Sequence, residues 1–205
     1  MGLMAARRRG TTAAALLLLS AMVTGCGGAA SAGTDGPGGD PAAAAGAGTA
    51  ATATVLPVAE RLPAPDTAGR DLAGRDLALR SYRGKVVVLN VWGTWCAPCR
   101  AEAPELEALR GALEPRGVRL VGVDVRDRST GPAVAFEKAY GLHYPSIHDP
   151  DGKLLLAYPP ALLNPQAIPS TLVVDRQGRI AAAVSGPVTR AQLEPLVTRV
   201  AEEGS

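Results

Sequence analysis

The stretch that most constrains this chain runs from Val86 to Pro104, where an apolar segment leads directly into two closely spaced cysteines. Residues 85–91 are rich in β-forming side chains and predict a buried strand. Cys96 and Cys99 follow where a helix is expected to begin, and the free N–H groups and positive dipole end of a helix stabilise a thiolate. Pro98 suits the first helical turn, where its missing N–H costs nothing. The stretch predicts a redox-active dithiol in which Cys96 is the more exposed sulfur and Cys99 resolves the mixed disulfide.

Two other uses of such a cysteine pair are open from the residues alone. A zinc site needs four ligands, but the chain has no second cysteine pair, and its two histidines, His143 and His148, lie far along the sequence. A purely structural disulfide between cysteines this close together would constrain the unfolded chain very little. The pattern favours redox chemistry over both, and we predict no metal site.

The residues around the dithiol resemble a known family. The sequence WCAPCRAEAP at 95–104, together with Ile-Pro-Ser-Thr at 168–171, is similar to the motifs of TlpA/ResA-like thiol–disulfide oxidoreductases, extracytoplasmic members of the thioredoxin superfamily. The similarity extends from about Pro63 to the C-terminus. It implies an enzyme that reduces protein disulfides with no cofactor beyond its own Cys96–Cys99 disulfide, and a membrane thiol transporter as the source of electrons. Several members serve cytochrome c biogenesis, although nothing in this sequence selects that substrate.

The resemblance also assigns a role to an acidic residue near the cysteines. Glu102, three residues after Cys99, stands where the family has an acid that tunes the cysteines or moves their protons. The alternative from the residues alone is a solvated acid in the first turns of a helix, where the dipole favours it. Asn90 occupies the place of a buried aspartate in cytoplasmic thioredoxins and cannot titrate, which gives Glu102 more weight as a catalytic residue.

A substrate-binding surface is expected beside the dithiol. Trp95 is predicted to be a partly exposed wall of this surface, next to Pro98, whereas Trp92 is predicted to lie in the core. From the residues alone, the Ile168–Pro169 bond is either cis or a trans bond that starts an edge strand. The resemblance implies the cis form, in which the backbone of Ile168 would pair with an extended substrate.

The N-terminal segment has the pattern of an export signal. Arg7 to Arg9 precede a short apolar run, Thr11 to Met22, which is shorter than the about 20 residues of a comfortable membrane span. This predicts a secretory signal peptide over residues 1–25. Its end, Val-Thr-Gly-Cys, resembles a bacterial lipobox and implies lipid modification of Cys26, so we predict a lipoprotein anchored to the outer face of the cell membrane. The alternative is ordinary cleavage among the nearby alanines, which would release a soluble secreted protein.

Residues 26–56 are predicted to be a disordered tether. They consist mainly of Gly, Ala, Ser, Thr and Pro, with Asp35 and Asp40 as the only charged side chains. A flexible chain of this length has an end-to-end distance of roughly 30 Å, which suits a tether between a membrane and a domain. Loss of the signal arginines leaves 18 basic residues against 19 acidic ones, a net charge of −1. No nucleic-acid partner is predicted from this balance.

Residues 57–205 alternate between strand and helix patterns and predict one α/β domain with the thioredoxin fold. The expected elements after the strand at 85–91 are a helix to about Leu113, a strand at 118–125, a helix at 132–140, a short strand at 144–148, a short helix at 153–158, strands at 170–175 and 180–184, and a final helix capped by Thr189. This order is a βαβ half followed by a ββα half, with a hairpin before the first half and a segment inserted between the two. Asp124, at a strand end, is interpreted as a cap rather than a catalyst, and Arg100 as part of the solvated rim.

Other classes of function stay open. Peroxiredoxins share the fold but need a Pro-x-x-x-Thr/Ser-x-x-Cys motif, which the residues before Cys96 do not supply. A copper-carrying lipoprotein could use the cysteines with His143 or His148, although the Cys-Ala-Pro-Cys spacing favours redox chemistry. The direction of electron flow is also open, so a disulfide-forming oxidase is the alternative to a reductase.

Overall fold

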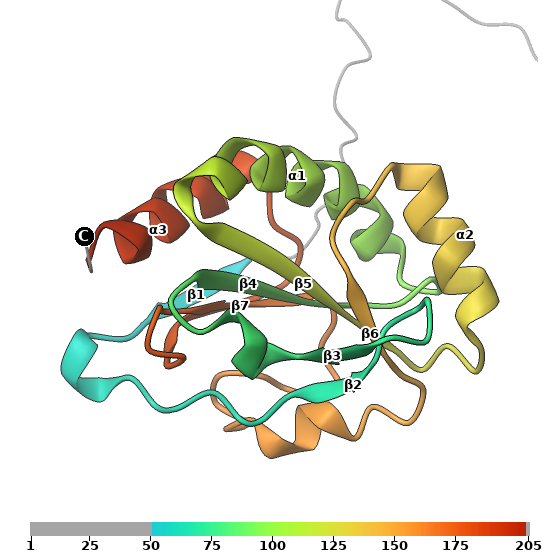
Figure 1. Ribbon diagram of the computed structural model, residues 1–205, viewed down its shortest axis with the longest axis horizontal. Helices are drawn as coiled ribbons and strands as arrows, with labels where there is room; N and C mark the ends of the chain where they lie inside the picture. Colours follow the sequence, from blue (N-terminus) through green and yellow to red (C-terminus); the bar gives the residue numbers. More distant parts are fainter. Residues whose placement is uncertain (1–50, 204–205) are drawn as a thin grey trace, which may run out of the picture. The chain divides into compact units, whose positions relative to one another are not determined.

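The central strand of the fold is β4 (Val86–Trp92), in which every residue is buried. It pairs in parallel with β5 (Val118–Val125) and antiparallel with β7 (Ser170–Val174). Strands β6 (Ser146–Asp149), β8 (Ile180–Ser185) and β1 (Thr52–Val55) complete a six-stranded sheet in the order β1-β8-β7-β4-β5-β6 (Figure 1). The computed structural model describes residues 51–203 of the 205-residue chain.

The α-helices of the described residues cover one face of this sheet (Figure 1): α1 (Ala97–Leu113), α2 (Thr130–Tyr140) and α3 (Arg190–Glu202). Their apolar side chains form one core with Val86, Val88 and Trp92 of β4. The intervening residues of β4, including Val87 and Leu89, belong to a second core on the opposite face. Because successive side chains of a strand point to opposite faces, β4 is shared between two cores, which explains its continuous apolar sequence.

The second face of the sheet is covered by the N-terminal hairpin and the inserted segment. The hairpin consists of β2 (Ala68–Arg70) and β3 (Asp76–Ala78), and Asp71 fixes its turn by accepting hydrogen bonds from the N–H groups of Ala73 and Arg75. Leu155 and Tyr158 of the inserted segment pack into the second core. The described chain also has 3-10 helices at Val58–Glu60, Leu79–Tyr82, Glu114–Arg116 and Leu154–Ala157.

The predicted thioredoxin fold, with its added hairpin and insertion, is confirmed. Strand β5 has the predicted bounds, and α2 begins two residues before the predicted start and ends before Gly141 as expected. Thr189 caps α3 through a capping box with Gln192, as its sequence position predicted. The short helix expected at 153–158 is a single 3-10 turn.

The C-terminal boundary predicted for the tether is wrong. Thr52–Val55 form strand β1, which pairs antiparallel with β8 from Thr52 opposite Ser185 to Val55 opposite Ala182. The Gly- and Ala-rich composition predicted disorder up to Leu56, but strand pairing uses backbone groups, and β8 offers an edge that β1 completes. The predicted signal peptide, Cys26 and the rest of the tether lie outside the described residues. Within residues 51–203, no helix has the length and apolarity needed to cross a membrane.

Candidate active site

Cys96 and Cys99 form a disulfide at the N-terminus of α1, with a Cα–Cα distance of 5.3 Å. Cys96 is the N-cap residue, and its Sγ accepts a hydrogen bond from the N–H of Cys99 at 3.1 Å. This arrangement favours a thiolate on Cys96 after reduction, because an N–H group and the positive end of the helix dipole face that sulfur. Cys96 is 4% exposed and Cys99 1%. The predicted order of exposure is therefore correct, although both residues are buried.

Glu102 lies three residues beyond Cys99 on α1 and is only 2% exposed, so the alternative of a solvated acid is wrong. Its Oε1 accepts a hydrogen bond from Asn90 Nδ2 at 2.8 Å, and its Oε2 accepts one from the Val188 N–H at 3.1 Å. Burial raises the pKa of Glu102 to about 7, and the two hydrogen bonds oppose this only in part. A carboxyl group that titrates near neutral pH close to a dithiol is suited to proton transfer.

Several distant segments converge to bury Glu102. Asn90, on the central strand, donates from the same Nδ2 to Thr171 Oγ1 at 3.2 Å. Thr171 belongs to β7, and Val188 precedes α3. Asn90, which cannot titrate, therefore orients Glu102 and connects it to the strand that follows Pro169.

A groove beside the disulfide contains three of the predicted substrate-binding residues. The Ile168–Pro169 bond is cis, as the resemblance implied, and it leads into β7, which is an inner strand rather than an edge strand. Pro98, Ile168 and Pro169 line an open groove of about 250 Å³ together with Thr52 and residues 185–187. The structure thus brings these three residues together, and their part in binding substrate stays a prediction.

Trp95 is held by the last residue of β5 and the first residue after it. It is 48% exposed, as expected for a wall of the surface, and its Nε1 donates to the carbonyl of Val125 at 3.2 Å. The guanidinium of Arg126 lies 5.4 Å from the centroid of the Trp95 ring, within cation–π range. Arg126 has φ of 62°, in the left-handed region that residues other than glycine seldom adopt. Trp92, by contrast, is buried in the core as predicted.

The end of β5 and the loop after it contain polar residues whose role was not predicted from the sequence. Asp127 accepts hydrogen bonds from both the N–H of Thr94, at 3.0 Å, and its hydroxyl, at 2.6 Å. Asp124 is fully buried and binds Nδ1 of His148 at 2.8 Å, so the interpretation of Asp124 as a cap is wrong. The sequence signal that could have predicted this contact is the position of Asp124 and His148 at the ends of two predicted strands. In the structure these strands are adjacent and parallel. Arg100 is exposed, as expected, and donates to the carbonyl of Thr94 at 2.8 Å.

The two histidines are each bound to a carboxylate. His143 Nδ1 lies 2.9 Å from Glu107 Oε1, and His148 contacts Asp124. In the part of the chain that the structure describes, no group of three or more His, Cys, Asp or Glu side chains is placed to hold a metal ion.

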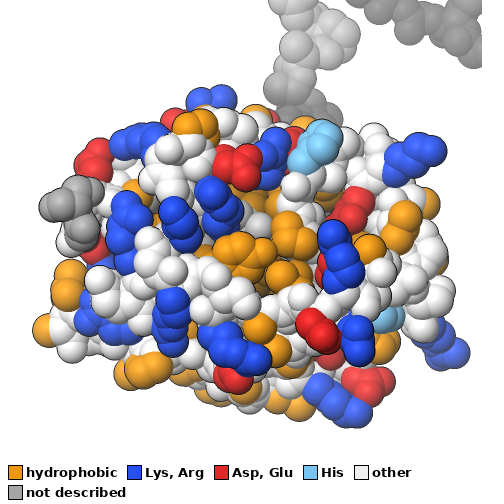
Figure 2. All heavy atoms as spheres, viewed as in Figure 1, with side chains coloured by type: hydrophobic (Ala, Val, Ile, Leu, Met, Phe, Trp, Pro, Cys, Tyr) orange, Lys and Arg blue, Asp and Glu red, His pale blue; other side chains and the backbone are white. Residues whose placement is uncertain are grey.

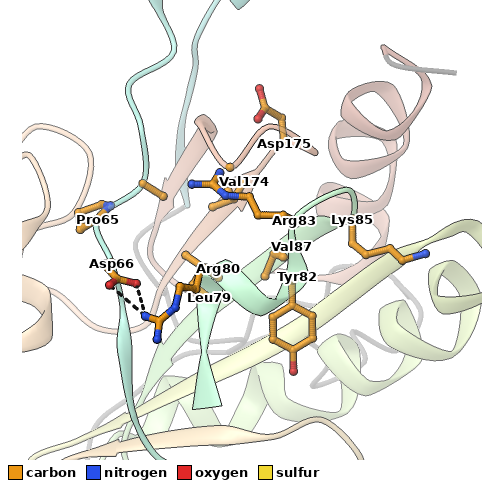
Figure 3. Close-up of a pocket in the computed structure, with 12 residues that line it drawn as sticks. Pro65, Asp66, Leu79, Arg80, Tyr82, Arg83, Lys85, Val87, Val174 and Asp175 are labelled. Atoms are coloured by element: carbon orange, nitrogen blue, oxygen red, sulfur yellow. Dashed lines mark hydrogen bonds and ion pairs between the residues drawn. The ribbon is translucent and has the colours of Figure 1, made fainter. Parts of the chain in front are cut away.

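A second cavity, of about 210 Å³, lies at the opposite end of β4 (Figure 3). Its lining includes Val87, Arg83 and Lys85, and an ion pair of 2.9 Å joins Arg80 to Asp66 at its wall. Since β4 begins at this cavity and ends at the disulfide, the cavity is remote from the redox site. Over the face shown in Figure 2, Lys and Arg side chains are interspersed with Asp and Glu side chains.

A disulfide capping the first helix of a thioredoxin fold, next to a buried acid and a cis-proline, defines a thiol–disulfide oxidoreductase. Comparison with known proteins agrees. Residues 61–183 match the AhpC/TSA family. Thiol-disulfide oxidoreductase ResA of Geobacillus kaustophilus is 34% identical over 134 residues, which cover 64% of this chain and 72% of ResA.

Solved structures show the same likeness. A secreted thiol-disulfide isomerase from Corynebacterium glutamicum has a TM-score of 0.65 and 33% identity, over 74% of this chain and 92% of that one. A DsbF homologue from Corynebacterium diphtheriae has a TM-score of 0.64 and 34% identity, over 72% of this chain and 92% of that one. The chain therefore belongs to the AhpC/TSA family of the thioredoxin superfamily, where it resembles the ResA-type thiol–disulfide oxidoreductases.

Proposed function

We propose that this protein reduces disulfides in other proteins outside the cytoplasm, while anchored to the outer face of the cell membrane through a lipid on Cys26. The observation that carries the proposed thiol–disulfide exchange is the hydrogen bond from the Cys99 N–H to Cys96 Sγ at the start of α1. The reductive direction is proposed from the resemblance to ResA-type oxidoreductases. A donor already aimed at this sulfur stabilises the thiolate, which is the form that attacks disulfides. The lipobox-like sequence supports the anchor, and the relative described as secreted supports the location.

The proposed reaction proceeds through two exchanges of sulfur–sulfur bonds. The Cys96 thiolate attacks one sulfur of the substrate disulfide, forms a mixed disulfide and releases the other substrate sulfur as a thiolate. Cys99 loses its proton and attacks Cys96 Sγ, which closes the Cys96–Cys99 disulfide and releases the second substrate sulfur. The substrate gains two electrons and leaves as two thiolates, which take up protons from the solvent, and the enzyme loses two electrons and the proton of Cys99.

In this scheme Glu102 accepts the proton that Cys99 must lose. A carboxyl with a pKa of about 7 is ionised often enough to accept a proton and protonated often enough to return one. The substrate would lie in the groove lined by Pro98 and Ile168, paired with the backbone of Ile168 as an added strand.

The family resemblance supports two further parts of the proposal. A membrane thiol transporter would re-reduce the Cys96–Cys99 disulfide after each turnover. Apocytochrome c, whose haem-binding cysteines must be reduced before haem attachment, is the proposed substrate class.

The equilibrium reduction potential of the full-length protein tests the direction of electron flow. Tryptophan fluorescence in graded thiol buffers reports it, because Trp92 and Trp95 lie just before Cys96 in the sequence. We expect roughly −250 mV or lower, close to the about −270 mV of thioredoxin. A value near about −120 mV, where strong oxidants lie, would contradict a reductase.

The second candidate function is disulfide formation or isomerisation. Solved relatives described as a thiol-disulfide isomerase and a DsbF homologue favour it. Oxidative refolding of a reduced, multi-disulfide protein distinguishes the two, since a reductant would delay the formation of native disulfides and an oxidase or isomerase would accelerate it. A peroxide-consumption assay with the reduced protein checks the peroxidase alternative, for which the residues before Cys96 predict no activity.

A further inference from the structure

The segments that surround the disulfide carry few charges. Residues 91–99, which contain both cysteines, have no charged side chain. Neither do residues 159–170 and 180–188, which include most of the residues lining the groove. Charge enters at Arg100, directly after Cys99, and at the loop that follows β5. The sign of the charge at these two places therefore decides which partner this surface suits.

Arg100 lies against the turn that leads into Cys96. Its side chain is exposed, and Nη1 donates to the carbonyl of Thr94 at 2.8 Å. The N-terminus of α1, where Arg100 lies, adds its own positive potential. A carbonyl oxygen does not neutralise a guanidinium, and Arg100 forms no ion pair with a carboxylate in the part of the chain that the structure describes. Arg100 therefore presents a full positive charge beside the cysteines.

Arg126, the first residue after β5, lies against the next residue of the same turn. Its guanidinium lies 5.4 Å from the centroid of the Trp95 ring, and Nη2 donates to the carbonyl of Pro165. An aromatic face attracts a cation but leaves its net charge in place. Like Arg100, Arg126 is exposed and pairs with no carboxylate among residues 51–203. Two guanidinium groups without a counterion thus border the residues directly before the attacking sulfur.

The acidic side chains near this turn are buried. Glu102, Asp124 and Asp127 are 2%, 0% and 7% exposed, and both oxygens of Asp127 accept hydrogen bonds from Thr94. Arg128, by contrast, adds a further exposed positive charge to the loop after β5. At this surface, the groups able to pair with a charge on a partner are therefore the arginines.

We propose that Arg100 and Arg126 form a docking surface for an acidic segment next to the disulfide of the protein substrate. This inference rests on the proposed function, because it names the substrate class of the same site. Carboxylates of the substrate would pair with the two guanidinium groups, which match a carboxylate in shape and charge. The uncharged groove would take up the chain around the reacting sulfur. Attraction between exposed charges raises the association rate more than the affinity, so the substrate would still be released quickly.

An anionic membrane surface would also attract exposed arginines. The contacts favour a protein substrate, because both arginines lie against the two residues directly before Cys96. This sulfur must meet a protein disulfide in the proposed reaction, so a group bound to these arginines lies where the substrate has to approach.

The test compares three peptides that contain the same disulfide, flanked by two Glu, two Ser or two Lys residues. Stopped flow measures how fast the reduced full-length protein reduces each peptide at pH 7. At low ionic strength we expect the acidic peptide to react about tenfold faster than the basic one, the lower end of the range for electrostatic steering. The ratio of the two rates should approach one at about 1 M salt, where the screening length falls to about 3 Å.

Variants show whether the two arginines cause this preference. Arg100→Gln combined with Arg126→Gln should bring the ratio close to one at low ionic strength, and Arg126→Gln alone should give an intermediate ratio. The ratio is the readout because a change in the reactivity of Cys96 affects both peptides equally and cancels. Arg80→Gln combined with Arg116→Gln is the matched control, since it removes two exposed charges remote from the disulfide. This control should keep the wild-type ratio.

Equal rates for the acidic and basic peptides, or a faster reaction of the basic one, would overturn the proposal. So would an equal loss of preference in the control. Arginine-dependent binding to vesicles of phosphatidylcholine and phosphatidylglycerol, without any peptide preference, would assign the two arginines to the membrane instead.

The Ser peptide tests the proposed function separately. If the reduced protein leaves it intact, the proposed reductase is contradicted. The charge preference is then measured in the other direction, with the three peptides as dithiols and the disulfide form of the protein as the oxidant. The acidic peptide must again react fastest, and an equal rate for all three would overturn the docking surface.

Discussion

Glu102 is a buried acid whose pKa is raised to about 7. Its replacement by glutamine removes this titration and leaves the shape of the side chain nearly unchanged. Glutamine mimics the protonated carboxyl in shape and cannot titrate. We expect Glu102→Gln to slow disulfide exchange at pH 7 by about 10²-fold, the lower end of general acid–base catalysis. The wild-type pH profile should have an inflection near pH 7 that the variant lacks.

The measurement is stopped-flow reduction of a small disulfide between pH 5 and pH 9. Glu105→Gln serves as the control, because it changes a half-buried acid on the same helix whose Oε2 accepts a hydrogen bond from the Arg190 N–H rather than from Asn90 or Val188. An inflection that persists in Glu102→Gln would assign the titration to another group, such as one of the cysteines.

The same burial predicts how stability depends on pH. The pKa of Glu102 is raised in the folded state from 4.5 to about 7, so its contribution to stability is full below pH 4.5 and is lost as the pH rises through 7. Glu102→Gln avoids this loss. We compare the free energy of unfolding of the variant with that of the wild type at each pH. Between pH 4 and pH 8 this difference should shift in favour of the variant by on the order of 3 kcal/mol. Urea unfolding at both pH values measures the gain, and a constant difference would contradict it.

Single residues also show what sequence could and could not predict about the site. The Cys96–Cys99 pair and cis-Pro169 follow from short motifs, since their geometry is local. The contact between Asp124 and His148 joins residues 24 positions apart, and it exists only because β5 and β6 pair in one particular register. Gly122 illustrates the same limit, because a Cβ there would lie 2.3 Å from Ser146 Oγ on the neighbouring strand. Such requirements appear only when the register is known.

At the scale of elements, the long apolar runs were predicted well and the edge strand was not. Strands β4 and β5 are buried on both faces, so their sequences alone identify them. Strand β1 is exposed along its whole length, and its hydrogen bonds to β8 involve backbone groups that composition does not reveal. The predicted boundary at Leu56 was therefore too late in the sequence.

Strand β1 gives a prediction about truncation. A chain shortened to begin at Leu56 loses β1 and exposes the edge of β8, whereas one that begins at Ala45 keeps it. We expect the shorter chain to unfold at a lower urea concentration and to form aggregates through the free edge. It should also lose the wall that Thr52 contributes to the groove beside Pro169. Equal midpoints and equal solubility for the two chains would show that β1 contributes nothing to the fold.

At the scale of the whole molecule, the two ends of the described chain lie at opposite poles of the sheet. Thr52 pairs with Ser185, at the end where the disulfide lies, and lines the groove beside Pro169. Helix α3 ends near the other pole, where Glu202 pairs with Arg116 at 3.1 Å and Arg176 binds the Ala201 carbonyl. On the proposed anchoring, the attachment point and the redox site therefore share one pole.

This arrangement predicts that moving the proposed anchor to the C-terminal end will affect re-reduction at the membrane but not the reduction of a soluble disulfide. A lipid anchor and flexible linker transferred to the C-terminal end should leave the reduction of a small soluble disulfide unchanged. Re-reduction by the proposed membrane thiol transporter, measured in vesicles that contain both proteins, should become slower, because the disulfide would then face away from the bilayer. Unchanged re-reduction would show that the domain reorients freely on its linker.

On the proposed anchoring, the position of Thr52 would also set how often the protein meets a partner in the membrane. If the tether is flexible, as its sequence predicts, the average distance between the redox pole and the lipid would be roughly 30 Å. Short flexible linkers correspond to millimolar effective concentrations. A weak and short-lived complex with a membrane thiol donor would then be sufficient for turnover. The surface around Cys96 would then not need to bind a partner tightly. Rapid release of each partner suits a protein that carries electrons between successive partners.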